Sequence, residues 1–289
     1  METKTSNKKD AYQLISDRIM KQLEKGVIPW KLNWSNVTVP TNITTLKPYR
    51  GVNILLLASL GYEQNYFLTL NQLTELGGEV KQDEKPYPVV YWKWEDGEKE
   101  AEKAVGKKKS ILLYYSVYNI SQCDGILENK IPQQENQGNP IQACEELVFK
   151  MPNQVQIVEV ADMPCYVLNT DVINLPAFKS FENAEAFYTT LFQELIHSTG
   201  HEKRLNRKEL VNYDKQNKKN YSVEELIGEI GACFLNALVG INGNCLQNNM
   251  ENISEWLKSL QNDKHLIIYA CTKAQKAVDY ILHENTNEK

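Results

Sequence analysis

The chain has 289 residues, a length that is large for one hydrophobic core and comfortable for two, so we expect two domains. Hydrophobic residues make up 42% of the chain and charged residues 24%, which excludes an intrinsically disordered protein. The net charge of −5 argues against a protein that simply coats nucleic acid.

The first predicted element is an amphipathic helix over Asp10 to Lys25, because apolar residues recur there at helical spacing. A short helix follows Thr69, which forms a capping box with Gln72. Two β-rich runs, 87–94 and 110–118, predict a hairpin with a charged tip.

The polar segment 128–140, rich in Gln and Asn, is the predicted linker between a front region, residues 1–127, and a back region, residues 141–289. The back region is expected to contain a short helix at 143–150, strands at 156–160 and 165–169, and helices at 182–199, 222–239, 254–261 and 265–282. Strands followed by a run of helices predict an α+β fold.

Charge is divided unevenly along the chain. Residues 1–122 carry 17 Lys and Arg against 14 Asp and Glu, a net of +3, which leaves −8 for the rest. A mildly basic front and an acidic back indicate two surfaces with different partners. The six cysteines include no close CxxC pair, which favours reduced, buried thiols. Because no segment has the apolar length of a membrane helix or a leader, we expect a cytoplasmic protein.

The chemistry-bearing motif is Gln193-Glu194-Leu-Ile-His197, with His201 four residues further on. In a metallopeptidase helix of HExxH type, the two histidines bind the metal from one face and the glutamate acts as general base. Helical spacing places Gln193 and His197 on one stripe and Leu191 and Leu195 on another. One stripe is expected to face a cleft.

A neighbouring helix that opens at Ser222 offers a third ligand. Glu225 and Glu229 are four apart in an apolar stretch, as expected for a ligand carboxylate and a supporting carboxylate. Ser222 and Glu225 also have capping-box spacing, so capping alone explains Glu225. From these residues alone, a metal site and a purely structural arrangement are equally good interpretations.

The resemblance of several segments to a known family favours the metal site over the purely structural arrangement. The segments 171–176, 181–188, 191–201, 204–207 and 224–232 resemble the metallopeptidase half of the ArdC-like antirestriction family, and 23–30, 48–53, 70–78 and 89–92 resemble its single-stranded-DNA-binding domain. The resemblance implies a zincin-like back region, DNA binding in front, and protection of a mobile element's DNA from restriction. It implies that Glu194 is the general base, His197 and Glu225 are ligands to zinc or another divalent metal, and Glu229 supports or replaces Glu225.

The sequence departs from that family at Gln193, where a neutral amide stands in place of the first histidine. Zinc prefers nitrogen and sulfur donors, so we expect a weak or absent metal and weak or absent peptidase activity. His201 is either a replacement ligand, turned back by Gly200, or a surface residue beyond the helix end.

Unpaired bases stack on aromatic rings while Lys and Arg follow the phosphates. The candidate DNA contacts are Tyr49, Arg50, Lys47, Trp30, Lys31, Trp34 and Lys93. Alternation through 88–94 also allows Val90, Trp92 and Trp94 to be simple core.

Three functions are therefore weighed. The first is a single-stranded-DNA-binding antirestriction protein with a degenerate peptidase domain. The second is an active metal-dependent peptidase acting on a restriction enzyme or another DNA-bound protein. The third is a non-enzymatic accessory protein of conjugative transfer or of a primase.

Overall fold

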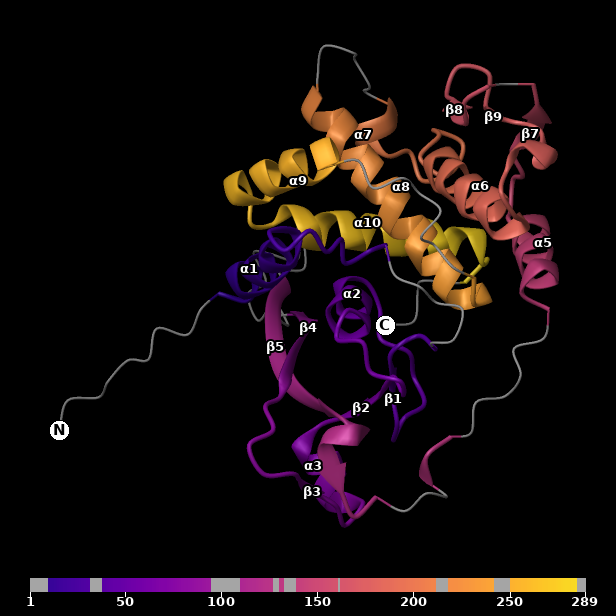
Figure 1. The fold of residues 1–289 in the computed structure, drawn as a ribbon. Coiled ribbons are helices and arrows are strands. Elements are labelled where there is room, and N and C mark those ends of the chain that lie inside the picture. The colour runs from indigo at the N-terminus through magenta and orange to yellow at the C-terminus, as the bar shows by residue number, and fades with distance from the viewer. Residues whose placement is uncertain are drawn as a thin grey trace, which may run out of the picture.

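The computed structural model describes residues 10–31, 38–94, 110–126, 130–132, 139–160, 162–211, 218–241 and 250–284 (Figure 1). Helices and strands are mixed along the chain, and the front and back regions form two layers in Figure 1. The expected α+β class is confirmed. None of the helices in these ranges is both long enough and apolar enough to span a membrane.

The front region is built on a four-stranded sheet in the order β1-β2-β5-β4. Its elements are α1 (Ala11–Leu23), β1 (Thr41–Asn42), α2 (Val52–Ala58), β2 (Tyr66–Leu68), α3 (Leu70–Glu75), β3 (Glu79–Val80), β4 (Tyr87–Trp94), β5 (Ser110–Asn119), a 3-10 turn (Ile120–Gln122) and β6 (Cys123–Asp124). The first helix, the short capped helix and the hairpin are where the sequence predicts them. The structure adds α2 and the strands β1, β2, β3 and β6, which are too short or too apolar to show a period.

Local capping explains where two of these helices begin. The Asp10 side chain accepts a hydrogen bond from the Tyr12 backbone N–H at the start of α1. At α3 the Thr69 hydroxyl accepts from the Gln72 backbone, and the Gln72 side chain accepts from the Thr69 backbone N–H at 2.9 Å. This is the predicted capping box.

The hairpin of β4 and β5 is antiparallel, with Trp94 opposite Ser110 and Tyr87 opposite Val117. Residues directly opposite each other share one face of the sheet. Val90 is buried, but Trp92 is 41% exposed and touches Tyr12 with its edge. The interpretation of Val90, Trp92 and Trp94 as simple core is therefore wrong at Trp92. The Trp94 side chain and the charged tip, 95–109, lie outside the described residues.

The back region contains a three-stranded sheet, in the order β7-β9-β8, and a group of helices. Its elements are α5 (Pro140–Lys150), β7 (Gln156–Glu159), β8 (Cys165–Val167), β9 (Val172–Leu175), a 3-10 turn (Phe178–Ser180), α6 (Ala184–Ser198), α7 (Lys208–Val211), α8 (Lys218–Val239), α9 (Met250–Asn262) and α10 (Leu266–Ile281). The sequence does not predict β9 or α7. It also places the start of α8 too late, because the helix begins at Lys218 and Ser222 lies inside it rather than at its cap.

One continuous hydrophobic core joins the two regions. It contains Ile15 and Ile19 of α1 and Leu55 of α2 together with Ile227 of α8 and Ala274 of α10. Figure 1 shows α10 lying between α8 and the front region. Two smaller clusters lie within the front region alone. The division of the chain at 128–140 stays a prediction, and most of that segment lies outside the described residues.

Candidate functional site

A cavity of about 960 Å³ lies between α6, α8 and the strand β8. Gln193, Glu194 and His197 line it from α6, and Glu224 and Glu225 line it from α8. The three side chains on which the metallopeptidase interpretation depends, Glu194, His197 and Glu225, therefore share one cavity. Their chemical roles stay a prediction.

The position of these side chains follows from how α6 begins and what it buries. The Asn183 side chain accepts from the Ala186 backbone N–H at 2.8 Å and starts the helix. Leu191 and Leu195 are buried on one side. Helical periodicity then turns Gln193 and His197 toward the cavity.

A buried network of charged groups holds His197. Its Nδ1 lies 3.0 Å from a Glu224 carboxylate oxygen. Arg207 donates to both oxygens of the same carboxylate, from Nε at 3.0 Å and from a terminal nitrogen at 2.6 Å. All three side chains are at most 8% exposed, so each charge needs its partners. Because Glu224 occupies Nδ1, Nε2 is the ring nitrogen of His197 that could bind a metal.

Arg207 also closes the end of α6. Its guanidinium donates to the Thr199 hydroxyl at 2.6 Å and to the Ile196 carbonyl at 2.7 Å. A Cβ on Gly200 would lie 2.8 Å from a guanidinium nitrogen, so only glycine leaves room for this side chain. Gly200 thus makes space for Arg207, which is a different role from the predicted turning of His201.

A second glycine sets the distance between α6 and α8. A Cβ on Gly228 would lie 2.5 Å from both Cε1 and Nε2 of His197. Side-chain atoms do not approach that closely, so a larger residue would displace the ring or the helix. Gly228 therefore allows α8 to pass directly beside His197.

Burial and neighbouring charges shift the pKa values of the site. Burial lowers the pKa of His197, but the hydrogen bond that it donates to Glu224 and the charges of Glu225 and Glu194 outweigh it and raise the pKa to about 9. Burial raises the pKa of Glu194, and the nearby Glu225 adds to this. Burial also opposes ionisation of Glu224, yet Arg207 and His197 hold its pKa below the usual value.

Glu229 lies one turn after Glu225 but does not line the cavity. Its carboxylate accepts a hydrogen bond at 2.8 Å from the indole N–H of Trp30, in the front region. Burial raises the pKa of Glu229, while the charge of Lys31 and the Trp30 bond oppose the shift. The supporting carboxylate that contacts His197 is Glu224, which the i, i+4 spacing of 225 and 229 did not identify.

His201 is placed differently from both expectations. It is only 7% exposed, so it is not a surface residue. It is also absent from the cavity lining, and its Nδ1 accepts the Lys203 backbone N–H at 3.1 Å. The structure therefore gives no support to His201 as a replacement ligand.

The far wall of the cavity is the edge strand β8 with its flanking residues. The Tyr166 hydroxyl donates to Asp171 at 2.8 Å, and the buried guanidinium of Arg204 pairs with the same carboxylate. Arg204 also donates to the Ser198 carbonyl at 2.8 Å. This clamp joins the wall to the end of α6.

The side chains present fit a tight zinc site poorly. Within the described ranges, no group of three or more His, Cys, Asp or Glu residues is arranged to hold a metal ion. The cavity offers the imidazole of His197, the carboxylate of Glu225 and the amide oxygen of Gln193. That set contains one nitrogen donor, and oxygen donors suit manganese or magnesium better than zinc.

Two of the candidate DNA contacts are aromatic rings that lie inside the protein. Trp30 is 3% exposed and packs against Trp256 of α9 at 5.1 Å. Tyr49 is buried against Phe67. The expectation that these rings stack on bases is therefore wrong, because the rings form part of the core.

Arg50 is also committed to the protein. Its guanidinium pairs with Asp279 of α10 and lies 3.5 Å from Glu284. The adjacent Gly51 N–H donates to Gln275 at 2.9 Å. Arg50 therefore joins the front and back regions, which corrects its assignment as a phosphate contact.

The other candidates differ from one another. Lys31 is partly buried, and burial lowers its pKa. Lys47 and Lys93 are exposed, and Trp34 lies outside the described residues. Tyr115, which the sequence reasoning missed, is 37% exposed. It lies on the same face of the hairpin as Tyr91 and Lys93.

Comparison with known proteins agrees with this geometry. A model described as the N-terminal domain of anti-restriction factor ArdC matches residues 9–119, and a model described as a zincin-like metallopeptidase matches residues 142–273. The chain superposes on crystal structures of the antirestriction ArdC protein from the R388 plasmid, one metal-free and one Mn(II)-bound, each with a TM-score of 0.75. Identities are 30% and 31%, over 97% of this chain and 99% and 100% of those chains.

Curated relatives include longer proteins. Two proteins of Escherichia coli named DNA primase TraC are each 28% identical over 95% of this chain, which spans only 27% and 20% of their lengths. The protein y4eC of Sinorhizobium fredii is 26% identical over 94% of this chain and 91% of its own length. With both regions matched in order, the chain belongs to the ArdC antirestriction family and carries a zincin-like metallopeptidase domain.

Proposed function

We propose that this protein binds single-stranded DNA through its front region and protects the DNA of a mobile element from restriction in the cytoplasm. Its back region keeps the zincin-like cavity but holds a divalent metal weakly or not at all, with weak or absent peptidase activity. The observation that carries the second part is Gln193, which lines the cavity beside Glu194 and His197.

The donor chemistry supports weak metal binding. A neutral amide oxygen replaces an imidazole nitrogen, and zinc loses more from that change than manganese does. The Mn(II)-bound structure belongs to the R388 relative, and only the donor class is carried over here. We therefore expect the preference for Zn²⁺ over Mn²⁺ to be smaller in this chain than in its Gln193→His variant.

The first experiment measures metal retained after dialysis of the full chain, without chelator, in the wild type and in Gln193→His. The wild type is expected to retain little metal. Gln193→His supplies the missing nitrogen and is expected to raise zinc affinity about 100-fold. Gln156→His, at an exposed position on β7, is the matched control. One tightly held zinc per wild-type chain would contradict the proposal.

The DNA-binding part rests on a surface other than the one expected from sequence. Tyr91, Lys93 and Tyr115 share one face of the β4–β5 hairpin by register, and the Tyr91 and Tyr115 rings lie 5.7 Å apart. Tyr91 is 43% exposed. Rings beside lysines at the edge of a sheet suit bases and phosphates of a single strand.

The same surface continues into a hollow of about 380 Å³ lined by Lys47, Tyr49 and Tyr115. Asn42 and Gln72 also line it and donate amide hydrogen bonds to each other. Their carbonyl oxygens also accept from neighbouring backbone N–H groups, and Lys47 is the cationic side chain of the lining. We assign it to the sugar–phosphate backbone of the bound strand.

The second experiment titrates the protein with oligothymidylate at low salt and follows fluorescence anisotropy. Tyr91→Leu is expected to weaken binding about tenfold through lost stacking. Lys93→Gln and Lys47→Gln are expected to reduce the salt dependence of binding. Lys150→Gln, an exposed lysine on α5, is the control. Absence of binding, or equal affinity for duplex DNA, would contradict single-strand binding.

A peptidase acting on DNA-bound proteins is the second candidate. It is favoured by β8, an edge strand that lines the cavity and can pair with an extended peptide. Wild-type hydrolysis of a partner protein, lost in Glu194→Gln, would establish this candidate. If neither DNA binding nor hydrolysis is found, the accessory role in transfer or priming is left.

A further inference from the structure

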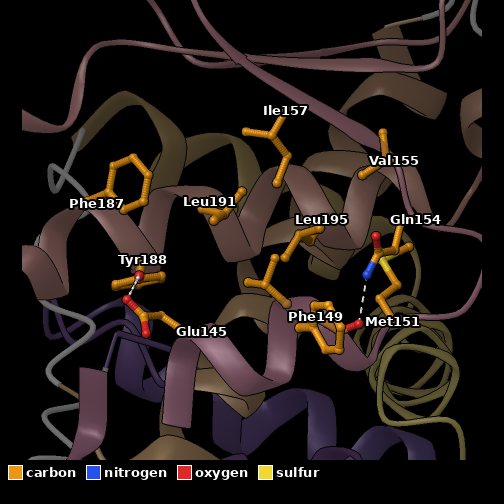
Figure 2. Close-up of a pocket in the computed structure, with 11 residues that line it drawn as sticks. Glu145, Phe149, Met151, Gln154, Val155, Ile157, Phe187, Tyr188, Leu191 and Leu195 are labelled. Atoms are coloured by element: carbon orange, nitrogen blue, oxygen red, sulfur yellow. Dashed lines mark hydrogen bonds between the residues drawn. The ribbon is translucent and has the colours of Figure 1, made fainter. Parts of the chain in front are cut away.

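A second hollow lies on another side of α6 from the cavity. Its volume is about 370 Å³, and its lining comes from α5, β7 and α6 (Figure 2). The lining residues are Glu145, Val148, Phe149, Met151, Gln154, Val155, Ile157, Phe187, Tyr188, Leu191 and Leu195. We name this surface the α5–α6 groove. It is apolar except at Glu145 and Gln154.

Two large aromatic side chains are exposed beside the groove. Phe149 is 79% exposed at the end of α5, and its carbonyl accepts the Gln154 amide at 2.7 Å. At another part of the groove Phe187 packs against Phe178, which is 47% exposed. Exposed aromatic side chains beside an apolar hollow are typical of a surface that binds a partner.

The charges around the groove define the partner. Glu145 lines it, and the Tyr188 hydroxyl donates to its carboxylate at 3.5 Å (Figure 2). Glu159 follows Ile157 by two residues on β7, so both side chains share one face of the strand. Lys150 of α5 lies 3.8 Å from Glu146, so these two charges balance each other.

This acidic rim selects among possible occupants. Nucleic acid and anionic lipid are repelled by carboxylates at the groove. A second copy that docked by the same face would bring like charges together. The groove, at about 370 Å³, is close in volume to the smallest ligand sites, which measure about 300 Å³. It therefore accommodates a few bulky side chains.

We propose that the α5–α6 groove binds a basic segment of a partner protein, with bulky apolar side chains in the groove and Lys or Arg against Glu145 and Glu159. This inference goes beyond the proposed function and does not depend on DNA or metal binding. Leu191 and Leu195 form the groove wall on the helix that also carries Glu194 and His197. A partner seated there therefore contacts α6 directly.

The test selects binders from a random peptide library displayed on phage against the immobilised full chain, with counter-selection on the Phe149→Ser variant. Phe149 is highly exposed, so its replacement leaves the core intact. Enriched peptides are expected to combine Lys or Arg with Leu, Phe, Trp or Met. A synthetic copy of the best peptide is then measured by calorimetry.

Phe149→Ser is expected to weaken that peptide about 30-fold, as for a central contact. Glu145→Gln is expected to weaken it about threefold and to lower its salt dependence. Leu46→Ser and Glu75→Gln, at exposed positions of the front region, are the controls and leave binding unchanged. Failure to enrich any sequence, enrichment of acidic sequences, or equal binding by wild type and Phe149→Ser would overturn the proposal.

Discussion

The two sides of α6 face hollows of opposite character. On one side Gln193, Glu194 and His197 meet the carboxylates of α8, and on the other Leu191 and Leu195 meet the apolar side chains of α5 and β7. The polar side is fixed by directional bonds such as those from Arg207 to Glu224. The apolar side is held mainly by packing, with one long hydrogen bond from Tyr188 to Glu145.

The contrast explains how the polar cavity tolerates a neutral side chain at position 193. Arg207, Glu224 and His197 satisfy one another without any metal, because two cationic side chains flank one carboxylate. The cost of burying these charges is offset inside the protein. A neutral Gln193 therefore changes the metal affinity while leaving the supporting network complete.

The largest effect is expected from breaking the network on the polar side. Arg207→Met leaves the buried carboxylate of Glu224 without its two guanidinium donors. We expect a loss of about 3–5 kcal/mol in the free energy of unfolding, measured by urea denaturation. The neighbouring exposed Lys208→Met is the control and should cost little. Equal stability of the two variants would mean that the network does not hold the site.

The apolar side is tested by Leu195→Ala. Leu195 is 1% exposed, and truncation removes buried methyl groups and leaves an enlarged hollow. We expect a loss of about 2–4 kcal/mol in urea denaturation. Leu238→Ala, at a 44% exposed position of α8, should lose far less. If Leu195→Ala lowered the free energy of unfolding more than Arg207→Met, packing rather than charge pairing would contribute most to holding α6 in place.

The clamp on the cavity wall gives a pH dependence. Burial opposes ionisation of Asp171, but Arg204 and Tyr166 outweigh it and hold its pKa below 3.8. Because the pKa of Asp171 is lower in the folded protein than in the unfolded chain, its ionised form stabilises the fold above pH 3.8. This stabilisation is lost as the pH falls. We expect Asp171→Asn to cost about 2 kcal/mol at neutral pH and progressively less as the pH falls below 3.8.

Asparagine is the informative replacement at this position because Asp171 has a φ of 54°, which Asn also tolerates. Urea denaturation of both proteins at several pH values gives the comparison. A stability difference that stays constant from neutral to acid pH would show that the charge pair is not its source.

The smallest effect is expected where the front region meets α8. Trp30→Phe keeps an aromatic ring but removes the N–H that Glu229 accepts. We expect a loss of about 1–2 kcal/mol. Trp256→Phe alters the same ring pair and leaves that hydrogen bond, so it is the matched control. A larger loss for Trp256→Phe would assign the contact to packing.

Elements with a clear local signal could be predicted from sequence. The Thr69 and Gln72 pair predicts its own hydrogen bonds, and the alternation in 87–94 predicts the hairpin. The two stripes of α6 follow from helical spacing. In each case the groups that interact are close in the sequence.

The errors arise where the partner is far away along the chain. Trp30 contacts Glu229, and Arg50 contacts Asp279, whereas the family resemblance, added to the aromatic and basic composition, made both look like DNA contacts. Glu224 was missed because its role depends on Arg207 and His197 rather than on a spacing within α8. The two-region organisation was predicted, but the way the regions pack together was not.

The continuous core of α1, α2, α8 and α10 has a consequence for dissecting this protein. Cutting the chain between the regions would strip Ile15 and Leu55 from one fragment and Ala274 from the other of their apolar neighbours. Separately expressed fragments would aggregate, whereas the intact unit can be moved as a single cassette into a larger polypeptide. Genetic fusions should therefore leave the junction whole and attach only at the chain ends.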